Sequence, residues 1–275
     1  MLPHRIVGAR CAATLALALA APSPAPAAPA PDLPRILEQA KARQKADVEA
    51  WTRFRFTRRS LREDLDAQGA VARSEDLEFV VTPSHGGFDE RLVRSDGAPP
   101  SPREVERRRD QRRFEKHYAT LVMGEQDGGG IDEGCSLGHL LRLSTHRYAG
   151  VERRGGVPCH RLDFGPDVTS TEGGIEGRFA RAMAGTLWIT VEGFHLAAAH
   201  ARTVRPISIA LSLGKIRDLE VTLESQPLSG GVWLPRRIEV RTVARVVVVP
   251  LRRRNVYEYT DFVSHDSGSE LSAGS

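Results

Sequence analysis

Apolar and polar side chains alternate over much of the chain. In the segment ISIALSLG, Ile207, Ile209, Leu211 and Leu213 fall on one side of an extended backbone, with serine and alanine side chains on the other. Successive side chains of a strand point to opposite faces, so this period of two predicts strands with one apolar face. The same alternation occurs at residues 54–57, 77–82, 161–164, 186–191, 219–225, 236–241 and 256–262.

Short turn-like segments separate these predicted strands, and helices are few. The segments DAQG, SHGG, RRGG, VEGF, LGK and LSGG have the composition of hairpin connections, which predicts antiparallel pairing of consecutive strands. Helical apolar spacing predicts a helix over 33–51, and we expect further helices over 102–120 and 137–144. The fold class is therefore mainly β (α+β), built on a curved antiparallel sheet.

The apolar face of such a sheet has to be covered. An exposed apolar patch of roughly 200 Å² costs about 5 kcal/mol. The predicted helices are too few to cover a large sheet, so we expect the sheet to curl around one or two of them and enclose a cavity. The alternative is that side chains fill this space and that nothing binds there.

The first thirty residues have the features of a leader. Arg5 and Arg10 precede an apolar run at 11–21, which is too short to span a bilayer, and a Pro/Ala-rich spacer follows. We expect a signal peptide and spacer over 1–30, one domain over 31–264 and a disordered tail over 265–275. The protein would then be exported and periplasmic, soluble after cleavage and not an integral membrane protein.

The balance of charge argues against one broad class of partner. The sequence has 39 Lys and Arg against 35 Asp and Glu. Arg5 and Arg10 belong to the leader, which leaves 37 basic residues against 35 acidic ones in the remainder. So small an excess gives no reason to expect nucleic-acid binding. The densest basic run, at 103–117, alternates arginines with acids at helical spacing, which is typical of a solvated helix face.

The sequence GCSLG at 134–138 matches the G-x-S-x-G nucleophile motif around Ser136. That motif requires a buried strand before the serine, a helix after it, and alternating strands and helices around it. Here a glycine-rich polar stretch precedes Ser136, and the chain lacks such an alternation. We interpret the match as a coincidence. Since no other residues have the spacing of a general acid and base, we predict no catalytic site and no enzyme.

Cys135 and Cys159 are the two cysteines that follow the leader. An oxidising compartment favours a disulfide between them, or free thiols, over a metal site. His139, His146 and His160 lie nearby in the sequence, but neither C-x-x-C nor H-E-x-x-H spacing is present. We therefore expect no metal and no other cofactor.

Four segments resemble those of a known group of proteins. They are RLVRSDGAPPSPREVE at 91–106, GTLWITVEGFHLAAAHART at 185–203, SQPLSGGVWLPRRIEVR at 225–241 and YEYTDF at 257–262. Over about residues 35 to 263, the chain resembles exported bacterial proteins of the outer-membrane lipoprotein-sorting carrier superfamily (LolA/LolB-like). It departs from their pattern at Thr190, where an acid is more usual. The resemblance implies an unclosed half-barrel with a few helices as a lid over a hydrophobic cavity that accepts acyl chains.

These observations favour a periplasmic, non-enzymatic carrier or binder of a lipid or a lipidated protein. Its hydrophobic partner would be an acyl chain or a lipoprotein. The alternative is an envelope interaction or sensor protein on the same scaffold, which binds a protein partner and transports no ligand. The predicted cavity residues, assigned by polarity alone, are Phe54, Phe56, Leu77, Phe79, Val81, Leu187, Ile189, Ile207, Ile209 and Leu211.

Overall fold

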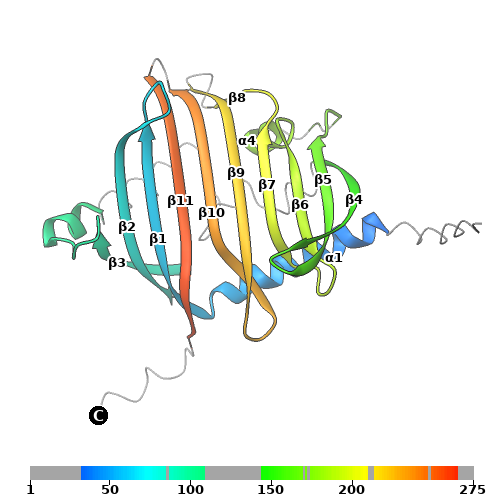
Figure 1. The fold of residues 1–275 in the computed structure, drawn as a ribbon, viewed down its shortest axis with the longest axis horizontal. Helices are drawn as coiled ribbons and strands as arrows, with labels where there is room; N and C mark the ends of the chain where they lie inside the picture. The colour runs from blue at the N-terminus through cyan, green and yellow to red at the C-terminus, as the bar shows by residue number, and fades with distance from the viewer. Residues whose placement is uncertain are drawn as a thin grey trace, which may run out of the picture. The chain divides into compact units, whose positions relative to one another are not determined.

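A single antiparallel sheet dominates the computed structural model, which describes residues 32–84, 87–108, 144–169, 171, 174–209, 214–246 and 249–265 (Figure 1). The sheet has 11 strands. They are β1 (Phe54–Leu65), β2 (Val71–Ser84), β3 (Gly87–Ser95), β4 (Ser144–Arg154), β5 (Val157–Pro166), β6 (Met183–Thr190), β7 (Leu196–Thr203), β8 (Ile207–Ile209), β9 (Gly214–Leu228), β10 (Val232–Val246) and β11 (Val249–Ser264).

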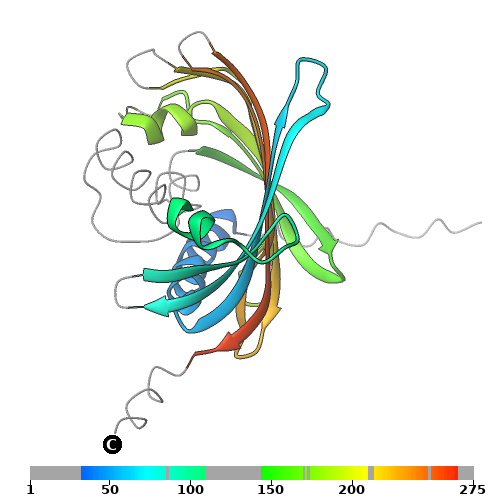
Figure 2. The same cartoon turned by 90° about the vertical axis from the view of Figure 1, so that its left-hand side faces the viewer.

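The strand order is β3-β2-β1-β11-β10-β9-β7-β6-β5-β4, and the short β8 pairs with β9. Most neighbours are consecutive in the sequence, as the hairpin turns predict, but β1 pairs with β11 at the far end of the chain. Because β3 and β4 lie at the two ends of the order, the sheet is open. Figure 2 shows its pronounced curvature. The predicted fold class, a curved and unclosed antiparallel sheet with few helices, is confirmed.

Helix α1 (Leu33–Trp51) lies across the concave face of the sheet (Figure 2). The carboxylate of Asp32 caps it by accepting a hydrogen bond from the backbone N–H of Arg35 at 3.4 Å. Its buried apolar residues lie on one side of the helix, at Ile36, Ala40, Ala50 and Trp51. The bounds of α1 coincide with the helix that the sequence predicts over 33–51.

The other helical segments are short. Residues 102–108 are helical, which confirms the beginning of the helix predicted over 102–120, and the rest of that prediction lies outside the described residues. Helix α4 (Gly174–Ala180) was not predicted. The helix predicted over 137–144 lies outside the described residues except for Ser144, which opens β4. The alternating pattern did not predict β4, because this strand at one end of the sheet has few apolar side chains.

Two clusters of buried side chains form the core between α1 and the sheet. The first lies under the N-terminal half of α1 and contains Ile36, Ala40, Leu162, Phe164, Ala182, Met183, Leu187, Ile189 and Ile207. The second lies under its C-terminal end and contains Ala50, Trp51, Phe54, Phe56, Leu77, Phe79, Val81, Leu92, Val232, Leu234 and Tyr259. One helix therefore covers two separate apolar regions of the same face.

Replacing Gly185 with Ala should destabilise the fold strongly. A Cβ at this position would overlap the backbone carbonyl of His200 and approach the Cα of Ala201 to 2.9 Å, so β6 and β7 would have to separate. We expect a loss of about 3 kcal/mol in the free energy of unfolding, measured by chemical denaturation. Gly165→Ala is the matched control, because its Cβ would meet only the Thr145 hydroxyl at 3.7 Å. An equal loss in both variants would contradict this reading of the close approach.

Candidate functional site

The predicted cavity residues whose side chains are described all lie on the concave face. Leu187, Ile189 and Ile207 belong to the first cluster, and Phe54, Phe56, Leu77, Phe79 and Val81 belong to the second. All eight are buried and pack under or beside α1. The backbone of Ile209 lies in β8, whereas its side chain and the whole of Leu211 lie outside the described part of the chain.

A row of paired residues joins the two clusters across the concave face. From Leu187 in the first cluster, the row runs through Ala199, Leu223, Ile238, Tyr257 and Ser60 to Leu77 in the second. Directly paired residues share a face of the sheet, so the whole row faces the same side as α1. The next row adds Ala201, Val221 and Val240.

The middle of this face is apolar and only half-buried. We call it the central apolar band: Ala199, Ala201, Val221, Leu223, Ile238, Val240 and Tyr257. None of these side chains was among the predicted cavity residues. The alternation at 219–225 and 236–241 could have identified four of them, but it could not show that α1 would leave them partly exposed. The band is a continuous apolar surface on the concave face whose side chains stay partly exposed.

The three polar side chains that are buried among the described residues meet at one place, where α1 crosses the sheet. The Nδ1–H of His195 donates to Oδ2 of Asp47 at 2.7 Å, and Oδ1 of Asp47 accepts from the backbone N–H of Trp233 at 3.3 Å. The hydroxyl of Thr190 accepts from the backbone N–H of His195 at 2.9 Å. We call Asp47, Thr190, His195 and Trp233 the helix anchor.

The helix anchor fastens the C-terminal half of α1. The ring of His195 stacks on that of Trp233, with centroids 5.7 Å apart. Arg43, one turn before Asp47, donates to the carbonyl of Gly193 at 3.1 Å. In contrast, Ile36 and Ala40 in the N-terminal half contribute apolar packing to the first cluster. The C-terminal half is therefore held by polar contacts in addition to the apolar packing of Ala50 and Trp51, whereas apolar packing holds the N-terminal half.

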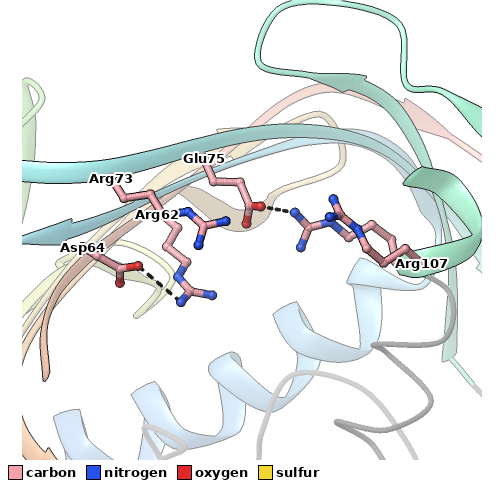
Figure 3. A pocket seen from close by; sticks show the side chains of 6 residues that line it. Arg62, Asp64, Arg73, Glu75 and Arg107 are labelled. Atoms are coloured by element: carbon pink, nitrogen blue, oxygen red, sulfur yellow. Dashed lines mark hydrogen bonds and ion pairs between the residues drawn. The ribbon is translucent and has the colours of Figure 1, made fainter. Parts of the chain in front are cut away.

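The concave face becomes charged toward the far end of the β1–β2 hairpin. A pocket of about 220 Å³ lies there, lined by Arg62, Asp64, Arg73, Glu75, Arg107 and Arg108 (Figure 3). Glu75 pairs with Arg108 from the 102–108 helix, and Asp64 accepts from Arg62 at 3.5 Å and from Arg253 at 2.7 Å. The hydrogen bond from Arg253, together with the charges of Arg253 and Arg62, lowers the pKa of Asp64.

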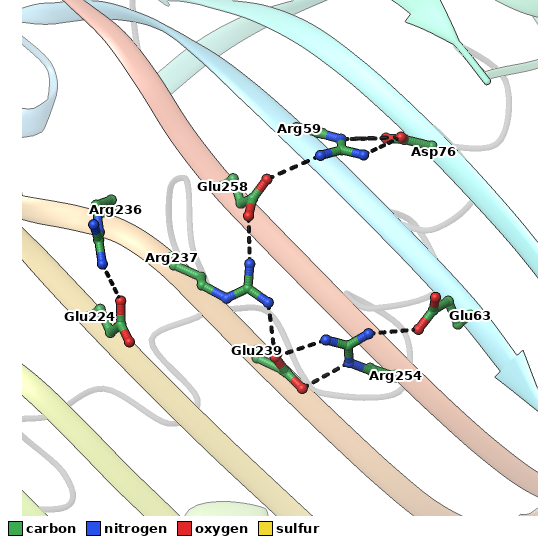
Figure 4. A network of polar contacts seen from close by, with 9 residues as sticks. All are labelled: Arg59, Glu63, Asp76, Glu224, Arg236, Arg237, Glu239, Arg254 and Glu258. Atoms are coloured by element: carbon green, nitrogen blue, oxygen red, sulfur yellow. Dashed lines mark hydrogen bonds and ion pairs between the residues drawn. The ribbon is translucent and has the colours of Figure 1, made fainter. Parts of the chain in front are cut away.

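Over β1, β2, β10 and β11 the convex face carries a network of ion pairs (Figure 4), and a small apolar cluster around Cys159 and Trp188 lies farther along the sheet. Across β1, β2 and β11, Arg59 contacts Asp76 at 2.7 Å and Glu258 at 3.3 Å. Glu239 of β10 accepts from Arg254 at 2.8 Å and from Arg237 at 3.0 Å. These hydrogen bonds, the one from Arg254 above all, lower the pKa of Glu239 to about 2. The two faces of one sheet thus have opposite chemistry.

The cysteine and histidine residues within the described part of the chain do not gather into one site. His146 and His160 pair with the concave-face residues Phe164 and Ile189. Cys159 lies on the opposite face and is fully buried, and burial raises the pKa of its thiol. No group of three or more metal-ligating side chains occurs within the described ranges. Cys135, Ser136 and His139 lie outside them, so the Cys135–Cys159 disulfide stays a prediction.

No family model and no curated protein matches the sequence. Among solved structures, the chain is similar to an outer-membrane lipoprotein-sorting protein domain from Vibrio parahaemolyticus, at 9% identity and a TM-score of 0.37 over 85% of this chain and 94% of that one. A LolA superfamily protein from Nitrosomonas europaea matches at 11% identity and a TM-score of 0.33, over 86% and 95% of the two chains. A DUF1329 family protein from Desulfovibrio piger matches at 9% identity and 0.33, over 86% and 94%. A ligand for this chain has to be argued from its own residues.

The described helices can be compared with the expectation that the protein is not an integral membrane protein. None of them combines the length and the apolarity that a membrane span requires. The leader predicted over 1–30 and the tail predicted over 265–275 fall almost wholly outside the described residues, so both remain predictions.

Asp47→Ala should destabilise the fold by about 3 kcal/mol, because it leaves the buried His195 ring and the Trp233 N–H without their acceptor. Chemical denaturation measures the loss. Glu49→Ala on the same helix is the control, since Glu49 is exposed and pairs with Lys45 only at 3.9 Å. We expect the control to change stability by less than about 0.5 kcal/mol. A similar small change in Asp47→Ala would show that packing alone holds α1.

Acid should weaken the fold through Glu239. Its folded pKa of about 2 lies below the ordinary value of 4.5, so its ion pairs stabilise the fold fully above pH 4.5 and are lost as the pH falls toward 2. We expect the wild type to lose about 2 kcal/mol from this group over that range, and Glu239→Gln to show a correspondingly flatter acid limb. Unfolding measured at a series of pH values provides the test. Parallel curves for the two proteins would rule out this contribution.

Proposed function

We propose that this protein is a periplasmic, non-enzymatic carrier or binder of a lipid or a lipidated protein. The observation that carries the proposal is the central apolar band, a half-buried apolar surface on the concave face of an open sheet. Such a surface is costly to leave in water, and an exposed apolar patch of this kind commonly marks a binding site. The charged convex face offers no comparable surface.

Acyl chains suit this surface because burial of methylene groups supplies the affinity. Each buried CH₂ contributes about 0.8 kcal/mol, so a chain that covers the band gains substantial free energy without any specific polar contact. The band is continuous across β7, β9, β10 and β11 because its members are paired neighbours. A long, flexible chain can therefore lie across several strands.

Helix α1 would act as the lid in this proposal. Its C-terminal half is held by the helix anchor, whereas its N-terminal half rests on apolar contacts through Ile36 and Ala40. An acyl chain can replace apolar contacts at little cost, but it cannot replace the hydrogen bonds of Asp47. The lid would therefore open at its N-terminal half while the helix anchor stays in place.

The second candidate is an envelope interaction or sensor protein that transports no ligand. The edge strand β4 favours it, because an edge presents unpaired backbone groups to which a partner strand can add. In this case the core under α1 would stay closed, and the partner would bind at the edge of the sheet.

Native mass spectrometry of protein purified from a periplasm without detergent separates the two candidates. The carrier proposal expects bound masses that disappear on denaturation and match lipids or acylated peptides. A clean mass of the protein alone, unchanged after incubation with envelope lipids, would overturn it. A partner protein captured from an envelope extract by such an apo protein would then support the second candidate.

Val240→Asn should weaken acyl-chain binding about tenfold, because it places an amide without a partner under the bound chain. Arg241→Asn is the matched control, since the neighbouring residue of β10 points to the convex face and is mostly exposed. A fluorescent fatty acid titrated against both variants and the wild type measures the change. Equal affinities in all three proteins would show that acyl chains do not lie on the band.

A further inference from the structure

The arginine-lined pocket at the end of the β1–β2 hairpin continues the concave face. On β2, the buried Val81, Phe79 and Leu77 are followed on the same side by Glu75 and Arg73. In the register of the sheet, Glu75 lies opposite Arg62 of β1, and Arg73 lies opposite Asp64. One face of one hairpin therefore changes from apolar to charged along its length.

The pocket holds more positive charge than its own acids neutralise. Four of its six lining residues are arginines, and the other two are Asp64 and Glu75. Arg253 adds a further positive charge beside Asp64. Asp64 is shared between Arg62 and Arg253, and Glu75 pairs with Arg108. The site is therefore short of negative charge.

Two of the arginines are available to a ligand. Among the described residues, Arg73 has no carboxylate partner, and it is exposed. Arg107 contacts Glu104 only at 3.9 Å, and 68% of its side chain is exposed. Guanidinium groups donate in a fork geometry that matches the oxygens of a phosphate, so this pair is suited to a phosphate group.

The pocket is adjacent to the central apolar band. Arg62 pairs with Asn255, and Asn255 pairs with Val240, so the three residues occupy one row of the concave face. Two strand spacings separate Arg62 from Val240, which corresponds to about 10 Å. A molecule with a charged head and an apolar chain can therefore place the head in the pocket while the chain lies on the band.

We propose that this pocket binds the phosphate headgroup of an anionic phospholipid whose acyl chains lie on the central apolar band. The inference rests on the proposed carrier function and adds the class of lipid. A soluble phosphate compound would use only the pocket, and the continuity with the band therefore favours a lipid. The hollow on the convex face is lined by three glutamates, Glu220, Glu224 and Glu239, and two arginines, Arg237 and Arg241. Arg236 and Arg254 also pair with its acids, so the arginines around it are already engaged by carboxylates.

The test compares short-chain phosphatidylglycerol with the phosphatidylcholine of the same chains by titration calorimetry. The wild type should bind phosphatidylglycerol at least tenfold more tightly at low salt, and added salt should reduce this preference. Both lipids carry a phosphate, but choline neutralises that of phosphatidylcholine, so the double variant Arg73→Gln/Arg107→Gln should lose most of its phosphatidylglycerol affinity, much less of its phosphatidylcholine affinity, and therefore the preference. Arg236→Gln/Arg241→Gln is the control, because it removes two similarly exposed arginines from the convex face and should keep the preference.

The outcomes separate this inference from the proposed function. If both lipids bind equally to the wild type, or if the preference survives in Arg73→Gln/Arg107→Gln, the headgroup site is wrong while the carrier function stands. If inorganic phosphate binds as tightly as phosphatidylglycerol, the pocket serves free phosphate and the lipid assignment is wrong. If neither lipid binds, the proposed function fails and this inference fails with it. Thermal unfolding of each variant confirms that it is folded.

Discussion

The contact between Asp47 and His195 determines where the long helix lies on the sheet. It joins residues 148 positions apart in the sequence, and it is made in a site from which water is excluded. A buried carboxylate is costly unless its oxygens are hydrogen-bonded, and here the imidazole and a backbone N–H fulfil that requirement. Because both carboxylate oxygens have their donors at this crossing, the contact favours this position of α1. The two core clusters and the uncovered band between them follow from that position.

The sheet separates two chemistries by the alternation of its strands alone. On β10, Ile238 and Val240 face the band, whereas Arg237, Glu239 and Arg241 face the ion-pair network. The network covers this part of the convex face with paired charges, which do not favour an apolar partner. The middle of the concave face is apolar, and charged side chains line the pocket at the end of the β1–β2 hairpin. The two ends of the concave face therefore differ in charge, so an elongated ligand with one charged end can bind in only one orientation.

Local pattern predicted much of the fold, and long-range contacts account for what it missed. Period-two alternation placed residues such as Leu187 and Phe79 on the correct face, and helical spacing gave the bounds of α1. The sequence could not show that Asp47 would contact His195, because the two residues are far apart in the chain and neither belongs to a local motif. The pocket that combines Arg62 and Arg73 with Arg107 likewise depends on how a short helix folds back over a hairpin. The half-exposure of the band depends on where α1 crosses the sheet, which the local sequence pattern does not encode.

The pairing of β1 with β11 has a consequence for the order in which the chain can fold. The meander β3-β2-β1 is joined to the rest of the sheet only through the last strand, so a chain lacking 249–264 has two separate sheets. Until that strand is in place, β1 and β10 each present a row of unsatisfied backbone groups to other chains. Contacts of such large sequence separation form slowly, because loop closure precedes any gain from pairing. The segment from β1 to β11, residues 54–264, is thus the smallest part of the chain that can form the continuous sheet, and the sheet stays in two parts until β11 is added.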